Sequence, residues 1–196
     1  LLNAREYRTM VNESYINAGE SPLFTDAEVS NPQYDTDWID QILASNSIVQ
    51  NYQVSASGGS NTTSYFASLG YFTQEGLLKK GSFDRYSARL NADHKFSDYV
   101  KIGANMSISR TVSDETTYDN SIYSPWPRAL VNRPDEPIYN ADGSFYNTSY
   151  NNPARMFLPE MTNKISKVLT TLYAEIKPIE GLTFRSAFGI DYTMLE

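Results

Sequence analysis

Apolar and polar residues alternate with a period of two in six segments between Asn51 and the end of the chain. Such a period puts successive side chains on opposite faces of an extended strand, so each segment is predicted to be a β-strand with one apolar and one polar face. In the clearest segment the apolar face consists of Tyr86, Ala88, Leu90 and Ala92. Its polar face consists of Arg85, Ser87, Arg89, Asn91, Asp93 and Lys95.

Two architectures produce such strands, and they place the apolar face in opposite environments. A soluble sandwich buries this face against a second sheet, whereas an outer-membrane barrel turns it to lipid and keeps the polar face around the lumen. On alternation alone the sandwich is favoured, because soluble all-β folds are commoner. The connections favour the barrel: short turns at 58–62, 95–99 and 177–181 alternate with longer ones, the longest from about 112 to 163. Transmembrane barrels have short periplasmic turns and long extracellular loops.

The first fifty residues have a different pattern. Asn3 and Glu6 form a capping-box motif before a short run of apolar residues at helical spacing, and Asp37 precedes a second such run that starts at Trp38. We therefore expect residues 1–50 to be a helical extracellular loop. Residues 51–196 are expected to be a partial β-barrel with a long extracellular loop at about 112–163.

The ends of the chain suggest a piece of a longer polypeptide. It begins at Leu1 and stops at Glu196, within a predicted strand. Six strands are too few to enclose a lumen, since the smallest membrane barrels have eight. We expect one continuous antiparallel meander whose first and last strands have outer edges unpaired within residues 1–196.

Several classes of function are disfavoured by composition. The chain has no cysteine, which excludes thiolate chemistry. Its single histidine, His94, excludes most zinc sites and most serine–histidine catalysis. Its net charge of -7 argues against nucleic acid as a partner. Pairs of Asp and Glu occur, but none lies at a strand end with a supporting signature for catalysis. We expect no enzyme, no catalytic residue, no cofactor and no metal ion.

The long loop contains the candidate contact residues. An aromatic set there could stack on sugar rings or anchor a partner protein, although packing within the loop's own small core is the commoner role. The candidates are Tyr118, Tyr123, Trp126, Tyr146 and Tyr150, and Phe157 belongs to the same set. Asp142-Gly143 predicts a small hairpin in this loop. Asp114, Glu115 and Asp119 could hold a calcium ion, but acidic loops are usually solvated.

The charged residues of the predicted polar strand faces form a second candidate group. They would line the lumen, or contact a plug, and their ordinary role would be ion pairing between neighbouring strands. This group is Arg85, Arg89, Asp93, Lys101 and Arg185.

The stretch from Asn51 to Ser109 resembles the barrel onset of SusC/RagA-type TonB-dependent outer-membrane transporters. The motifs that carry the resemblance are the segments 57–60 (SGGS), 69–72 (LGYF), 74–76 (QEG) and 85–91 (RYSARLN). The flanks agree: residues 3–7 and 37–38 look like the first loop of that family, and residues 139–143 look like its third loop.

The resemblance implies an antiparallel meander within a 22-stranded barrel in the outer membrane of a bacterium. It implies import of oligosaccharides or peptides, with a SusD-like surface lipoprotein and TonB as protein partners and outer-membrane lipid around the barrel. TonB would act through the N-terminal part of such a transporter, which the resemblance does not include. A dimer of transporter–lipoprotein pairs is a further implied assembly. The alternative is a soluble or surface-attached β-sandwich that acts as a glycan-binding module or adhesin.

Overall fold

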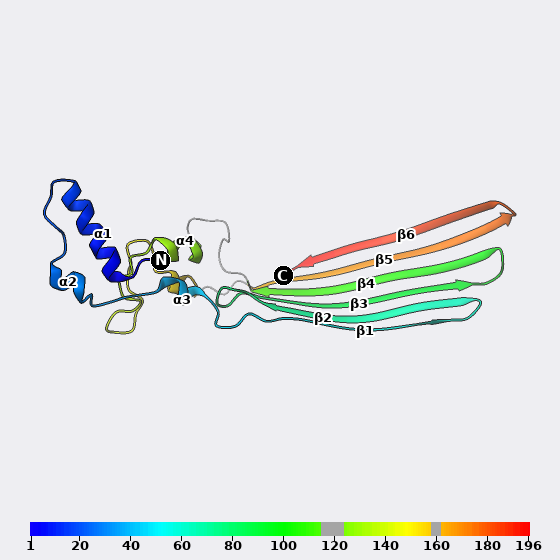
Figure 1. Ribbon diagram of the computed structural model, residues 1–196. Coiled ribbons are helices and arrows are strands. Elements are labelled where there is room, and N and C mark those ends of the chain that lie inside the picture. The colour runs from blue at the N-terminus through cyan, green and yellow to red at the C-terminus, as the bar shows by residue number, and fades with distance from the viewer. Residues whose placement is uncertain (115–123, 158–161) are drawn as a thin grey trace. The chain divides into compact units, whose positions relative to one another are not determined.

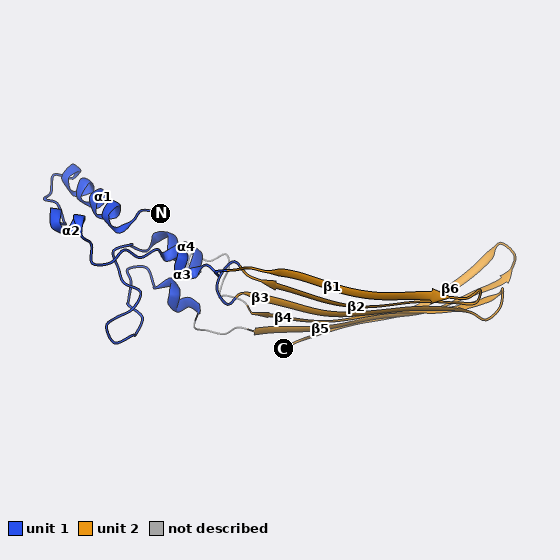
Figure 2. Cartoon of the chain, turned by 60° about the horizontal axis from the view of Figure 1, so that its bottom comes forward, with its two compact units in different colours: residues 1–45, 77–80, 116–161 blue, residues 46–76, 81–115, 162–196 orange. Residues whose placement is uncertain are grey.

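The computed structural model describes residues 1–114, 124–157 and 162–196, which form two units (Figures 1 and 2). One unit is a sheet built from residues 46–76, 81–115 and 162–196, and the other is a helical unit built from residues 1–45, 77–80 and 116–161. The two units are described separately below.

The sheet unit contains six antiparallel strands in the order of the sequence. Figure 1 shows them as one layer of long strands. The strands are β1 (Val49–Gly59), β2 (Thr63–Glu75), β3 (Ser82–Lys95), β4 (Val100–Asp114), β5 (Thr162–Ile179) and β6 (Leu182–Leu195). Each strand pairs only with its neighbours in sequence, so the predicted meander is confirmed.

The strand register assembles one continuous apolar face from the alternating residues. For example, Leu69 on β2 lies opposite Ala88 on β3, which lies opposite Ile108 on β4. Large apolar side chains of this face remain exposed, with 67% of Leu69 and 44% of Leu90 accessible. In the described part of the chain all six strands belong to one sheet, so no second sheet covers this face, as the barrel alternative predicts.

The two outer strands are free on one side, as predicted. Within residues 1–114, 124–157 and 162–196, β1 pairs with β2 and β6 pairs with β5, and β1 and β6 do not pair with each other. A closed six-stranded barrel is therefore excluded. The outer edges of both strands present backbone groups that a membrane-embedded sheet must pair.

The helical unit begins with α1 (Ala4–Asn17), whose predicted capping box is present. The Asn3 side chain accepts a hydrogen bond from the Glu6 amide, and the Glu6 carboxylate accepts one from the Asn3 amide. The predicted second helix is α3 (Trp38–Ile42), and the Asp37 carboxylate caps it by accepting from the amides of Ile39 and Asp40. Both helix starts therefore follow from the residue types at their caps.

Three short elements of this unit were not predicted. They are α2 (Asp26–Ser30), α4 (Pro125–Val131) and the 3-10 helix η1 (Pro153–Phe157). The core of the unit consists of Trp38, Ile42, Ala129 and Phe157. The long connection between β4 and β5 thus contributes α4 and η1 to a packed core with α3, and it is more than a surface loop.

Candidate functional site

The five charged residues predicted to face a lumen all lie on the polar face of the sheet. Arg85, Arg89 and Asp93 lie on β3 at every fourth position, and the register places Asp93 opposite Gly103. Lys101 on β4 lies opposite Glu175 on β5, which lies opposite Arg185 on β6. All five therefore belong to the face opposite the apolar one.

A cluster of polar contacts crosses four strands near the short-turn end of this face. The Tyr173 hydroxyl donates a hydrogen bond to the Asp93 carboxylate, and Lys101 Nζ lies 3.7 Å from Asp93 Oδ2. The Arg185 guanidinium lies 4.0 Å from the centre of the Tyr173 ring, and its Nη1 lies 3.2 Å from Glu175 Oε1. The cluster links β3, β4, β5 and β6 through side chains in addition to the backbone ladder.

Gly103 makes this cluster possible. It is buried on β4 between Asp93 on β3 and Tyr173 on β5. A Cβ atom at this position would overlap both the Tyr173 ring and the Asp93 carboxylate. The Tyr173 side chain therefore reaches across β4 to Asp93 because Gly103 leaves the space open.

Sequence reasoning missed Tyr173 and Glu175 as members of this cluster. Tyr173 alternates with the apolar residues of β5 and so belongs to the polar face, but its partner Asp93 is eighty residues earlier in the chain. Only the strand register brings the two together. The one signal in the sequence was a tyrosine at a polar-face position of its strand.

Arg85 and Arg89 lie farther from the short turns and have different surroundings. The Arg85 guanidinium lies 5.5 Å from the centre of the Phe72 ring on the neighbouring strand. Both arginines line a hollow of about 250 Å³ on the polar face, together with Gln53, Gly70 and Ser87. This hollow is a polar depression in the wall of the sheet.

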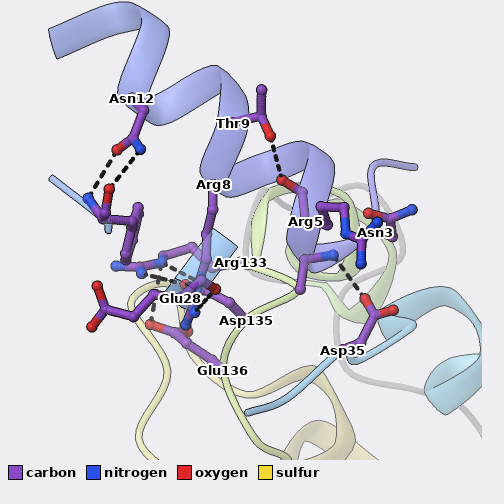
Figure 3. A network of polar contacts seen from close by, with 12 residues as sticks. Asn3, Arg5, Arg8, Thr9, Asn12, Glu28, Asp35, Arg133, Asp135 and Glu136 are labelled. Atoms are coloured by element: carbon purple, nitrogen blue, oxygen red, sulfur yellow. Dashed lines mark hydrogen bonds and ion pairs between the residues drawn. The ribbon is translucent and has the colours of Figure 1, made fainter. Parts of the chain in front are cut away.

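The helical unit is held by a buried carboxylate, Asp135, which Figure 3 shows between two arginines. Arg8 Nε lies 2.9 Å from Asp135 Oδ2, and Arg133 donates to both Asp135 oxygens at 3.0 Å. Burial acts to raise the pKa of Asp135, but the hydrogen bonds from Arg133 and Arg8 outweigh it and hold that pKa below its usual value. The ion pair between Arg8 and Asp135 joins α1 to the segment that follows α4.

Further polar contacts tie the start of the chain to the rest of the helical unit (Figure 3). The Asn12 amide group bonds the backbone N and O of Phe24 at 2.9 and 2.8 Å. The Ala4 amide donates to Asp35 Oδ1 at 2.7 Å. These bonds satisfy the backbone groups of Phe24, before α2, and the amide of Ala4 at the start of α1.

The aromatic candidates of the long connection are only partly described. Tyr118 and Tyr123 lie outside the described residues. Trp126 and Tyr150 have about half of their surface exposed, and Tyr146 is half-buried. Phe157 is buried in the core of the unit. The predicted hairpin around Asp142-Gly143 is present, with Tyr139 paired to Phe145 and Gly143 at a φ of 82°.

The three acidic residues considered as calcium ligands are also only partly described. Asp114 accepts hydrogen bonds from the hydroxyls of Thr162 at 2.6 Å and Ser82 at 3.0 Å, whereas Glu115 and Asp119 lie outside the described residues. Among the residues that are described, no cluster of three or more His, Cys, Asp or Glu side chains is placed to hold a metal ion. The same residues include no helix long and apolar enough to cross a membrane.

No protein-family model matches this chain. It is 30% identical over 199 residues to TonB-dependent receptor P26 of Formosa agariphila, a match that covers 98% of this chain and 19% of that protein. It is 28% identical over 146 residues to TonB-dependent receptor SusC of Bacteroides thetaiotaomicron, across 74% of this chain and 13% of that protein. The chain spans about a fifth of the length of these relatives or less.

Solved structures agree on the fold. The RagAB peptide transporter superposes with a TM-score of 0.76 at 21% identity, covering 98% of this chain and 26% of that one. The RagAB peptide importer in its closed-closed state gives a TM-score of 0.68 at 24% identity, over 96% of this chain and 23% of that one. The meander of β1 to β6 and its flanking helices therefore have the fold of part of that barrel.

Proposed function

The chain is a segment of a SusC/RagA-type TonB-dependent transporter, and from this premise we propose that it forms part of the wall of a barrel that imports nutrients across the bacterial outer membrane. The apolar face of the sheet then contacts lipid, and the polar face lines the lumen. The protein is a transporter and not an enzyme in this proposal, and its relatives carry receptor and transporter names.

The observation that carries the proposal is the exposed apolar face with aromatic side chains near both ends. Tyr52, Tyr71 and Tyr86 stack along one row, with ring centroids 6.4 and 4.9 Å apart. Phe96, which is 63% exposed, lies beyond the other end of β3. Ten residues of strand span about 33 Å, or about 25 Å across a bilayer at a tilt of about 40°, which matches the apolar band of outer-membrane barrels.

The proposed orientation places the short turns in the periplasm and the long connections outside the cell. Residues 1–50 and about 112–163 would then be extracellular. Trp126, Tyr146 and Tyr150 are proposed to contact the substrate or a SusD-like lipoprotein, as are Tyr118 and Tyr123. Contact with TonB is assigned to parts of the protein outside this segment, and the whole barrel is proposed to have 22 strands.

The substrate class is proposed as oligosaccharides or peptides. The RagAB structures are named as a peptide transporter and a peptide importer, and they share the fold of this segment. The runner-up function, a soluble β-sandwich that binds glycans, is disfavoured because in the described chain no second sheet covers the apolar face.

Fractionation of cells that express the full-length protein tests this proposal. We expect the protein in the outer-membrane fraction, soluble only in detergent, and we expect nutrient uptake to stop when TonB is deleted. Recovery of the folded protein in the soluble fraction would contradict the proposal. Uptake that persists without TonB would refute the energy coupling while leaving the membrane location intact.

A further inference from the structure

The polar face of the sheet has an uneven distribution of charge. The register arranges this face in rows, and four consecutive rows run from the pair Phe72 and Arg85 to the pair Phe66 and Asn91. Across all six strands these rows contain three cations and one carboxylate. The cations are Arg85, Arg89 and Lys167, and the carboxylate is Asp191.

The single carboxylate is already paired. Asp191 Oδ2 lies 3.6 Å from Lys167 Nζ. Lys167 is on β5, two strands away from Arg89 on β3, and Asp191 is on β6, three strands away. Neither Arg85 nor Arg89 forms an ion pair with any described residue, and both side chains are exposed. The other charged cluster of this face, around Tyr173, is internally compensated by Asp93 and Glu175.

The surroundings of the two arginines are suited to an anionic ligand. They line the same hollow of about 250 Å³, together with Gly70, Gln53 and Ser87. Guanidinium groups bind oxyanions through paired, charge-assisted hydrogen bonds. The amide and hydroxyl side chains beside them can bond neutral hydroxyl groups. The segment has a net charge of -7, so this local excess of positive charge is opposite in sign to the charge of the segment.

We propose that Arg85 and Arg89 form an oxyanion subsite in the lumen wall, which binds the sulfate or carboxylate groups of an acidic oligosaccharide as it passes. This inference rests on the proposed transport function and names the substrate class of the same surface. An oligosaccharide is favoured over a peptide because hydroxyl and amide side chains surround both arginines, and the Phe72 ring beside Arg85 offers an apolar surface to a sugar ring.

Binding of three defined tetrasaccharides and one acidic peptide to the purified full-length transporter tests the inference. The probes are a chondroitin sulfate tetrasaccharide, a hyaluronan tetrasaccharide that has carboxylates but no sulfate, neutral cellotetraose, and tetraglutamate. We expect both acidic sugars to bind more tightly than cellotetraose at low salt. The double variant Arg85→Gln, Arg89→Gln should lose at least about tenfold in affinity for them, because hydrogen bonds to charged groups are the strong ones.

The matched control is Arg110→Gln. Arg110 lies on β4 opposite Tyr86, next to the Arg85 row but on the apolar face. This substitution removes one positive charge at the same level of the sheet, where Arg110 Nη2 lies 3.9 Å from Glu196 Oε2, whereas the double variant removes two. It should leave acidic-sugar affinity unchanged. Because every variant is first checked for outer-membrane location, failure of the transport proposal is recognised separately.

Three results would overturn the inference. The first is that neither acidic tetrasaccharide binds better than cellotetraose. The second is that tetraglutamate alone shows the arginine dependence, which would assign the subsite to peptides. The third is that the double variant lowers thermal stability without changing any affinity, which would mean that the arginines pair with carboxylates elsewhere in the polypeptide.

Discussion

Gly103 is the residue whose substitution tests the polar cluster most sharply. Alanine there would push its Cβ into the Tyr173 ring and the Asp93 carboxylate. We expect Gly103→Ala to destabilise the barrel by about 1–3 kcal/mol, the usual cost of overpacking. The measurement is the temperature at which the folded barrel in detergent unfolds, read from its shifted migration on a gel.

The Tyr173→Ala background supplies the control for this prediction. Tyr173 supplies two of the three atoms nearest to the added methyl group, and the third is at the flexible end of Asp93. Gly103→Ala should therefore cost much less in that background. An equal cost in both backgrounds would show that Gly103 is needed for a reason unrelated to Tyr173.

Asp135 gives the helical unit a dependence on pH. Its pKa is below the usual value of 3.8 in the folded protein, so the ionised carboxylate stabilises the fold at all pH values above that usual value. The stabilisation is lost as the pH falls through the lower, folded pKa. We expect the helical unit of the full-length protein to lose resistance to pepsin as the pH is lowered from about 5 to about 2, measured relative to an unfolded substrate at each pH.

Substitution of Asp135 tests the same contact at neutral pH. Asp135→Asn removes the charge between Arg8 and Arg133 and should cost about 3 kcal/mol, because it leaves partly buried arginines without their partner. Glu13→Gln, an exposed carboxylate on α1, should change stability by less than about 0.5 kcal/mol. Urea titration followed by proteolysis measures both, and equal effects would refute a special role for Asp135.

Residue types predicted the caps of α1 and α3 but could not predict the polar cluster. A cap depends on residues within three positions of each other, such as Asn3 and Glu6. The contact between Tyr173 and Asp93 depends instead on the registers of two strand pairs. A shift of one residue in either pair would place the two side chains on opposite faces.

At the scale of elements, the long strands were predictable, whereas three of the four short helical elements were not. Strands of 11 to 18 residues repeat the period of two often enough to be recognised. The α3 helix, of 5 residues, was recognised together with Asp37 before it, whereas the α2 and α4 helices, of 5 and 7 residues, complete too few turns to show a period. Their caps were the remaining signals: Thr25 with Glu28 forms a capping box, and Pro125 follows Ser124 at the start of α4.

The two faces of β3 should respond differently to an added charge. Leu90 lies near the middle of the apolar face and is 44% exposed, and Asn91 is its neighbour on the polar face. Leu90→Arg should destabilise the barrel by about 2–4 kcal/mol, the cost of a charge at the middle of a bilayer. Unfolding in lipid vesicles by urea measures this cost.

Asn91→Arg provides the comparison within the same strand. It adds the same side chain to the lumen-facing side and should change stability by less than about 1 kcal/mol. If both variants lost the same stability, the two faces would have equivalent surroundings, and a lipid-facing role for one of them would be wrong.

At the scale of the whole molecule, the proposed membrane location would require further strands beside the free edges of β1 and β6. Each unpaired backbone group in hydrocarbon costs several kcal/mol, so an open sheet of this length cannot stand alone in a membrane. The relatives offer a simple source of those strands, since the chain matches only 19% of TonB-dependent receptor P26. The meander and its free edges were predictable from the alternation, whereas the packing of the helical unit around Trp38 was not, because its core joins segments far apart in sequence.

In the proposed barrel, one face of the sheet contacts lipid and the other contacts water. The chain contains no cysteine, so single cysteines placed in turn from residue 86 to residue 93 provide specific sites for spin labels in this segment. In outer membranes, labels at even positions should be accessible to oxygen, which partitions into lipid, and labels at odd positions should be accessible to a water-soluble nickel complex. Even positions that are inaccessible to both reagents would mean a face buried under protein, as in a sandwich, and would contradict the account.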